Sequence, residues 1–129
     1  MARSDIVPTM FKVRIEGSFA AAHRLVHYNG KCERLHGHNY KVRVWAEGET
    51  LGEGGMLVDF GLLKKALNEV LLSLDHSDLN EIAVFADDPS AERIAKYIFD
   101  GIKGLDKGLP IAAVDVFETD TSMARYRPD

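Results

Sequence analysis

Hydrophobic and polar residues alternate in two segments of the first half of the chain. The segment 11–16, FKVRIE, places apolar residues against charged ones, and the segment 39–47, NYKVRVWAE, repeats the pattern. A period of two predicts strands with one buried and one exposed face. We therefore expect strands at 11–16 and 39–47. Between them, 18–24 is small and largely apolar, and the Asn-Gly of 27–31 indicates a turn.

The middle of the chain changes to helical spacing. Apolar residues recur every three or four positions, which predicts an amphipathic helix: Leu62, Leu63, Ala66, Leu67, Val70, Leu71 and Leu74. Asp59 is the expected N-cap of this helix, which should end near residue 74. A second helix should begin after the N-cap Ser90 and end where the glycines of 101–108 start.

Two further strands are expected at 111–117 and 124–127. The order ββααββ predicts an α+β fold, with an antiparallel four-stranded sheet and two consecutive helices on one face. So small a sheet has exposed edges, which oligomerisation can close. We interpret 1–9, which lacks the apolar stretch of a signal peptide, as a flexible lead-in, and 10–129 as a single domain.

Composition excludes several classes of protein. The chain has 129 residues, a formal net charge of −4 and one cysteine. Mild acidity argues against bulk binding to nucleic acid or anionic membranes, and no apolar run reaches the ~18 residues of a membrane span. A single cysteine forms no intramolecular disulfide, which fits a reducing cytoplasm.

Three histidines form a candidate metal site. His36 and His38 are two residues apart, so an extended segment projects both imidazoles from one face. His23, at the end of the preceding segment, is the best third ligand. Three histidines with an open position are typical of catalytic zinc. A closed structural site with Cys32 as fourth ligand is the alternative, as is a pair of ordinary packed or solvated strand histidines.

Four other residues are candidates for chemistry, each with a simpler alternative. Cys32 lies between charged neighbours, where a nearby cation favours its thiolate, although a lone cysteine is most often an inert buried residue. Asp75 can orient His76, or the pair can simply cap the helix C-terminus. Glu118 shares the expected buried face of its strand and can accept the paired N–H donors of an amino-pyrimidinone ring, or lie exposed at the strand end.

Five segments, in order, resemble the 6-pyruvoyl-tetrahydropterin synthase family, which includes 6-carboxy-tetrahydropterin synthases. They are FAAAHRL at 19–25, CERLHGHNY at 32–40, LDHSDLN at 74–80, DPSAERIA at 88–95 and Glu118-Thr119. The resemblance covers nearly all of the chain after Thr9. It implies the tunnelling fold, in which subunits join sheets into a barrel and two trimers stack into a hexamer.

The resemblance also implies an activity. It implies a lyase that acts on 7,8-dihydroneopterin triphosphate, with Zn²⁺ held by His23, His36 and His38. It further implies that Cys32 acts as base, that Asp75 and His76 transfer a second proton, and that Glu118 anchors the pterin. Active sites of the family lie between subunits. Ser90 stands where the family often has threonine, as a candidate substrate contact.

The product is the open question, because Cys32 is followed by Glu33. The cysteine, the chain length and the Cys-x-x-x-His spacing resemble the enzymes of queuosine biosynthesis that form 6-carboxy-tetrahydropterin. A variant group uses a glutamate here and cleaves the side chain to 6-hydroxymethyl-dihydropterin for folate synthesis. Glu33 is either such a second base or a solvated neighbour that pairs with Lys31 or Arg34. A 6-pyruvoyl-tetrahydropterin synthase and a non-catalytic pterin- or metal-binding protein are the remaining alternatives.

Overall fold

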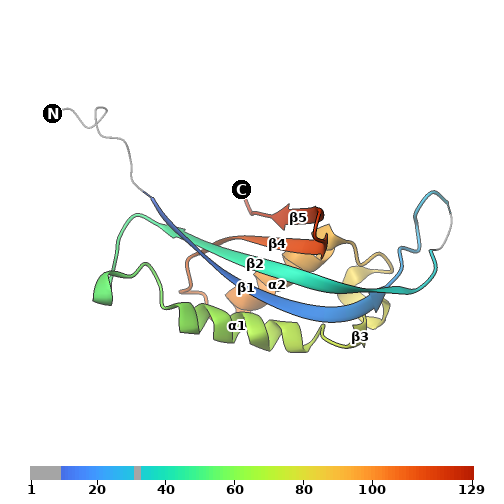
Figure 1. The fold of residues 1–129 in the computed structure, drawn as a ribbon, viewed down its shortest axis with the longest axis horizontal. Helices are drawn as coiled ribbons and strands as arrows, with labels where there is room; N and C mark the ends of the chain where they lie inside the picture. The colour runs from blue at the N-terminus through green and yellow to red at the C-terminus, as the bar shows by residue number, and fades with distance from the viewer. Residues whose placement is uncertain (1–9, 31–32) are drawn as a thin grey trace.

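A computed structural model describes residues 10–30 and 33–129. Five strands form one sheet in the order β3-β1-β2-β4-β5, and two helices cover one of its faces (Figure 1). In chain order the elements are β1 (Phe11–His23), β2 (His36–Gly48), the 3-10 helix η2 (Glu53–Gly55), α1 (Phe60–Leu72), β3 (Ser77–Asp78), the 3-10 helices η3 (Leu79–Glu81) and η4 (Ala83–Phe85), α2 (Ala91–Leu105), β4 (Ile111–Thr119) and β5 (Ser122–Tyr126).

The sheet confirms the α+β class and corrects the number of strands. The pairs β1–β2, β2–β4 and β4–β5 are antiparallel, as expected. The strand that the sequence did not predict is β3, which pairs in parallel with the edge of β1. It has only two residues, so it is too short to carry an alternating pattern. The sheet of the single chain is open, with β3 and β5 at its edges.

The core lies between the helices and one sheet face. Alternate residues of β1, β2 and β4 are buried there, among them Phe19 and Tyr40, whose rings stack 4.7 Å apart. Helix α1 packs on β1, and α2 packs on β4 and β5. At Gly17 a Cβ atom would lie 2.9 Å from a methyl group of Leu67 in α1. Glycine permits this close approach of α1, and the strand runs on through it to His23, beyond the expected end at residue 16, because it stays paired with β2.

Both helix starts are confirmed, and one helix end is wrong. The side chain of Asp59 accepts a hydrogen bond from Gly61 N, and that of Ser90 accepts one from Arg93 N. Helix α2, however, continues past Gly101 to Leu105. A Cβ atom at Gly101 would lie 3.0 and 3.1 Å from the methyl groups of Val70. Gly101 therefore permits close packing of α1 against α2 instead of ending the helix.

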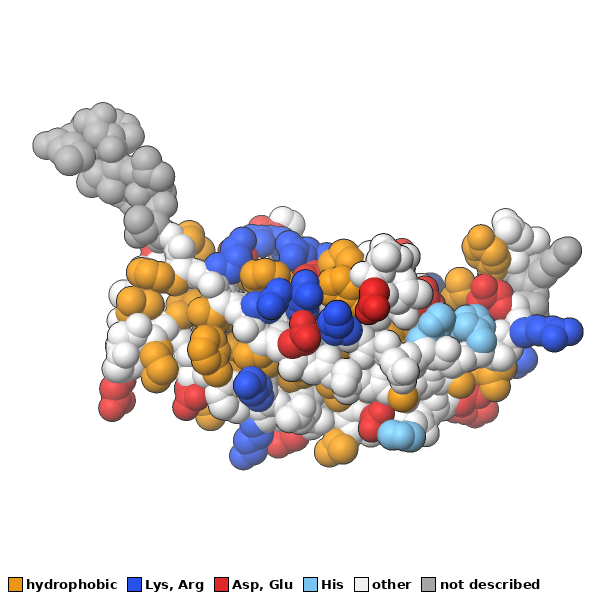
Figure 2. Space-filling view, viewed as in Figure 1, with side chains coloured by type: hydrophobic (Ala, Val, Ile, Leu, Met, Phe, Trp, Pro, Cys, Tyr) orange, Lys and Arg blue, Asp and Glu red, His pale blue; other side chains and the backbone are white. Residues whose placement is uncertain are grey.

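The other sheet face is polar and basic. Lys12 and Arg14 lie over the ring of Trp45, and Arg43 lies over Phe117. Figure 2 shows Lys and Arg side chains gathered over the middle of the sheet, away from the histidines at the right-hand end. Among the described residues, no helix is long and apolar enough to cross a membrane.

Candidate metal centre

The register of β1 and β2 brings the three predicted histidines together. His23 is directly opposite His36, and Ala21 is opposite His38. Paired residues of antiparallel strands point to the same side, and residues two apart share a face. All three imidazoles therefore continue the buried face that Phe19 and Tyr40 begin. The alternation that builds the core also builds the cluster.

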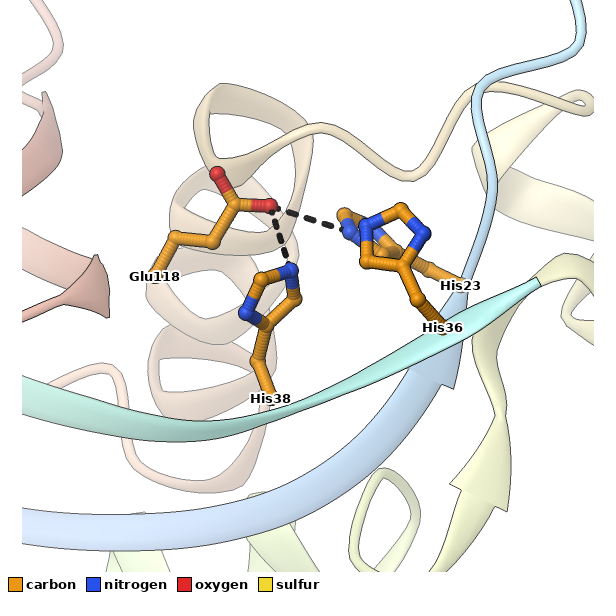
Figure 3. Close-up of side chains that lie close together, drawn as sticks. All are labelled: His23, His36, His38 and Glu118. Carbon is orange, nitrogen blue, oxygen red and sulfur yellow. Dashed lines mark ion pairs between the residues drawn. The ribbon is translucent and has the colours of Figure 1, made fainter. Parts of the chain in front are cut away.

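A carboxylate completes this cluster. The ligand atoms of His23, His36, His38 and Glu118 all lie within 4.8 Å of one another, and Figure 3 shows the four side chains converging from β1, β2 and β4. Oε1 of Glu118 is 3.0 Å from Nε2 of His23 and 3.2 Å from Nε2 of His38. Only 2% of His23 is exposed. A cluster of this composition can hold a metal ion.

Backbone carbonyls fix the orientation of two imidazoles. Nδ1 of His23 lies 2.9 Å from the carbonyl oxygen of Pro89, and Nδ1 of His36 lies 2.7 Å from that of Arg34. Because a carbonyl oxygen can only accept, Nδ1 must carry the hydrogen in both rings. The Nε2 atom of each neutral ring is then left with a lone pair. Metal-binding histidines are commonly oriented by such a hydrogen bond to the second nitrogen.

The buried nitrogens of the cluster fit a cation. Nε2 of His23 and Nε2 of His38 are buried without a well-oriented hydrogen bond among the described residues, despite the nearby Glu118 oxygen. Burial, the largest effect, lowers the pKa of His38 below its ordinary value. This favours the neutral imidazole that binds metals. Imidazole nitrogens and a carboxylate oxygen 3.0 to 3.2 Å apart are a donor set that could hold a divalent metal.

The sequence did not predict that Glu118 lies beside the three histidines. It put Glu118 on the buried face of its strand, which is correct, but assigned it only to the pterin. Val42 pairs with Val116 and Lys41 with Phe117, so the next residue of β4 extends toward Tyr40 and His38. That position depends on the β2–β4 register, which the alternation within one strand does not reveal.

The loop before β2 carries the two candidate bases. Cys32 lies outside the described residues. Glu33 is described, and its Oε1 accepts a hydrogen bond from Leu25 N at 2.8 Å. Its own backbone N–H donates to Leu25 O at 3.0 Å. The two bonds together close the loop 25–33 at its base. Of the two suggested partners, Lys31 lies outside the described residues, and pairing of Glu33 with Lys31 or Arg34 stays a prediction.

The pair Asp75–His76 forms a separate group beside β1, directly before β3 in the chain. Nδ1 of His76 is 3.0 Å from Oδ2 of Asp75, and Oδ1 of Asp75 accepts a hydrogen bond from Ala20 N at 2.9 Å. This backbone bond is the largest of the effects that lower the pKa of Asp75. His76 has a positive φ of 56°, and its side chain is 84% exposed. Asp75 therefore orients His76, as predicted, but directs it to solvent.

Ser90 has a local structural partner, because its hydroxyl accepts the hydrogen bond of Arg93 N at 3.2 Å. The preceding residue, Pro89, supplies the carbonyl that orients His23. A backbone carbonyl directly before α2 thus contacts the histidine cluster. No sequence pattern indicates this role, since a carbonyl oxygen is available at every residue.

Comparisons with known proteins agree with this geometry. The profile of the 6-pyruvoyl tetrahydropterin synthase family matches residues 12–129. The chain is 41% identical to a 6-carboxy-5,6,7,8-tetrahydropterin synthase of Synechocystis sp., over 91% of this chain and 93% of that one. It is 38% identical to the human 6-pyruvoyl tetrahydrobiopterin synthase, over 85% and 86%.

A solved structure shows the same architecture. The 6-pyruvoyl tetrahydropterin synthase of Caenorhabditis elegans superposes with a TM-score of 0.82 at 29% identity, and the match covers 94% of this chain and 97% of that one. The open sheet with two helices on one face is therefore the subunit of the tunnelling fold. The chain belongs to the 6-pyruvoyl tetrahydropterin synthase family.

Proposed function

We propose that the protein converts 7,8-dihydroneopterin triphosphate to 6-carboxy-5,6,7,8-tetrahydropterin, with loss of triphosphate and acetaldehyde, in a zinc-dependent lyase reaction. The observation that carries the proposal is the cluster of three histidines at the end of the buried sheet face. The choice of product is supported by the 41% sequence identity of this chain to a 6-carboxy-5,6,7,8-tetrahydropterin synthase.

The proposed metal is zinc, held by Nε2 of the three histidines. Imidazole ligands suit zinc, and three of them leave a position for substrate. When bound, the metal supplies Lewis-acid polarisation of the substrate's side-chain hydroxyls, which acidifies the neighbouring C–H and O–H groups. The Pro89 and Arg34 carbonyls hold two of the rings in the ligating tautomer before the metal arrives.

The other residues bind the substrate and move protons. The Glu118 carboxylate accepts hydrogen bonds from the N–H groups of the pterin ring. One third of this side chain is exposed beside the cluster. Cys32, four residues before His36 in the sequence, is the proposed base for the carbon-bound proton. The proposed contact of Ser90 with substrate is secondary to its capping bond.

The second proton-transfer group is proposed to come from another subunit. Asp75 and His76 lie beside β1, and His76 is exposed to solvent. An oriented but exposed His–Asp pair at a sheet edge is suited to a site completed by a neighbouring chain. A hexamer built from two trimers, as the family resemblance implies, would also cover the edges at β3 and β5.

The contact of Glu33 supports the carboxy product over side-chain cleavage. Its carboxylate is engaged by Leu25 N, and a base must be able to reach the proton that it removes. We therefore assign Glu33 to holding the loop, and Cys32 to the chemistry.

The test is product identification. Purified, reduced, zinc-loaded protein is incubated with 7,8-dihydroneopterin triphosphate, and the products are identified by mass spectrometry. We expect 6-carboxy-tetrahydropterin and acetaldehyde, and no turnover by a His36→Ala control. Mainly 6-hydroxymethyl-dihydropterin would show that cleavage is the activity. No turnover by a protein that retains zinc would favour a binding protein.

A further inference from the structure

We infer that Glu118 is a fourth ligand of the metal in the substrate-free protein, and that it gives up this position when substrate enters. The inference rests on the proposed metal site and deepens it. Glu118 then has two successive partners: first the metal, and afterwards the N–H edge of the pterin.

Two distances within the cluster, both from Glu118, match those of a coordination shell. In tetrahedral zinc with ligands at 2.0–2.2 Å, the ligand atoms lie about 3.3 Å from one another. Oε1 of Glu118 lies 3.0 Å from Nε2 of His23 and 3.2 Å from Nε2 of His38. One carboxylate oxygen thus stands at the spacing of a ligand from two of the three histidines at once.

The chemistry of these contacts favours a cation between the groups. In a neutral His23 ring, Nε2 carries a lone pair, because Nδ1 donates to Pro89 O. A lone pair and a carboxylate oxygen 3.0 Å apart repel each other unless a positive charge lies between them. Neither Nε2 contact is a well-oriented hydrogen bond among the described residues. A divalent ion shared by all the groups resolves the conflict.

The position of Glu118 also permits it to leave. It is the penultimate residue of β4, and its side chain is 33% exposed, whereas that of His23 is 3% exposed. His23 is therefore held by burial, and His36, although exposed, is held by its hydrogen bond to the Arg34 carbonyl. Glu118, at the end of its strand, is the exchangeable ligand. A closed four-ligand site keeps the metal bound between turnovers, and a catalytic site must open a position for substrate. Exchange of one carboxylate for a substrate hydroxyl meets both needs without a change in the histidines.

The experiment measures metal binding directly. Wild type, Glu118→Gln and Asp120→Asn are prepared metal-free. Their Zn²⁺ affinity is measured by competition with a chromophoric chelator, and the visible spectrum of the Co²⁺-substituted forms is recorded without substrate. Asp120 is the matched control, because it is a carboxylate two residues away whose side chain is 96% exposed. Melting temperatures of the metal-free forms check that each variant is folded.

We expect Glu118→Gln to weaken Zn²⁺ binding at least about tenfold and to change the Co²⁺ spectrum, while Asp120→Asn matches wild type. Equal affinity and an unchanged spectrum in folded Glu118→Gln would overturn the inference, and would leave the proposed function intact if wild type still turns over. Absence of stoichiometric metal binding in wild type would overturn both.

Discussion

The histidine cluster and the Asp75–His76 pair differ in how far one chain completes them. The cluster lies on the buried sheet face, where His23 is 2% exposed and two rings are tied to backbone carbonyls. The pair lies beside β1, with His76 84% exposed and at a positive φ. The candidate metal site is thus formed within one subunit, whereas the proposed proton-transfer pair is exposed and, in our proposal, is completed by a neighbouring chain.

The largest effect is expected from removal of a proposed metal ligand. His36→Ala should abolish turnover. It should also lower Zn²⁺ affinity by more than ~100-fold, which is the upper end of the loss seen when a residue that only orients a ligand is removed. Metal content by mass spectrometry and a turnover assay measure both. The control is His27→Ala, which removes a histidine whose partner is Asp88 and should retain the metal. Stoichiometric zinc in His36→Ala would contradict the assignment of the cluster.

The next largest effect is expected from a change in the Asp75–His76 pair, which should lower turnover without loss of metal. His76→Asn should lower turnover by about 10²–10⁴-fold, the range for loss of a general acid or base, with unchanged zinc content. Asparagine is chosen because it tolerates the left-handed backbone that His76 adopts. A parallel loss of zinc in this variant would mean that the two regions are not independent.

Periodicity explains how much of this could be predicted. The alternation of 39–47 and the spacing of 62–74 predicted β2 and α1, because both elements bury one face on the core. The shared face of His36 and His38 followed from the same rule. By contrast, Glu118 and Pro89 reach the cluster through the pairing of β4 and the placement of α2. These contacts depend on tertiary structure, which no local pattern in the sequence contains.

A smaller effect on stability is expected from Glu33, which binds Leu25 N in the loop from β1 to β2. Glu33→Ala leaves Leu25 N without its side-chain acceptor and should cost about 1–3 kcal/mol of unfolding free energy. Glu33→Gln keeps an oxygen that can accept this bond, and should retain most of the stability and the carboxy product. Chemical denaturation and product ratios are the measurements. If Gln and Ala variants shift the product ratio alike, Glu33 acts as a base instead.

The smallest expected effect is a pH dependence of the melting temperature that arises from Asp88. Asp88 accepts hydrogen bonds from His27 N and Val26 N, and the bond from His27 N is the largest cause of its lowered pKa. A lowered pKa stabilises the fold above the ordinary value of about 3.9, and this contribution is lost as the pH falls through the folded-state pKa. The melting temperature of Asp88→Asn should therefore lie below that of wild type at pH 7, and the gap should narrow below about pH 4. A gap independent of pH would contradict this role.

The measurement that tests the comparison most directly is activity after subunit exchange. His36→Ala supplies an intact Asp75–His76 pair, and His76→Asn supplies an intact cluster; each is expected to be inactive alone. If the two groups meet between chains, random mixing combines both intact groups in about one quarter of the sites, and turnover should return toward that fraction of wild type. Mass spectrometry of the mixed oligomers verifies exchange. Mixed oligomers that form but stay inactive would contradict a site shared between subunits.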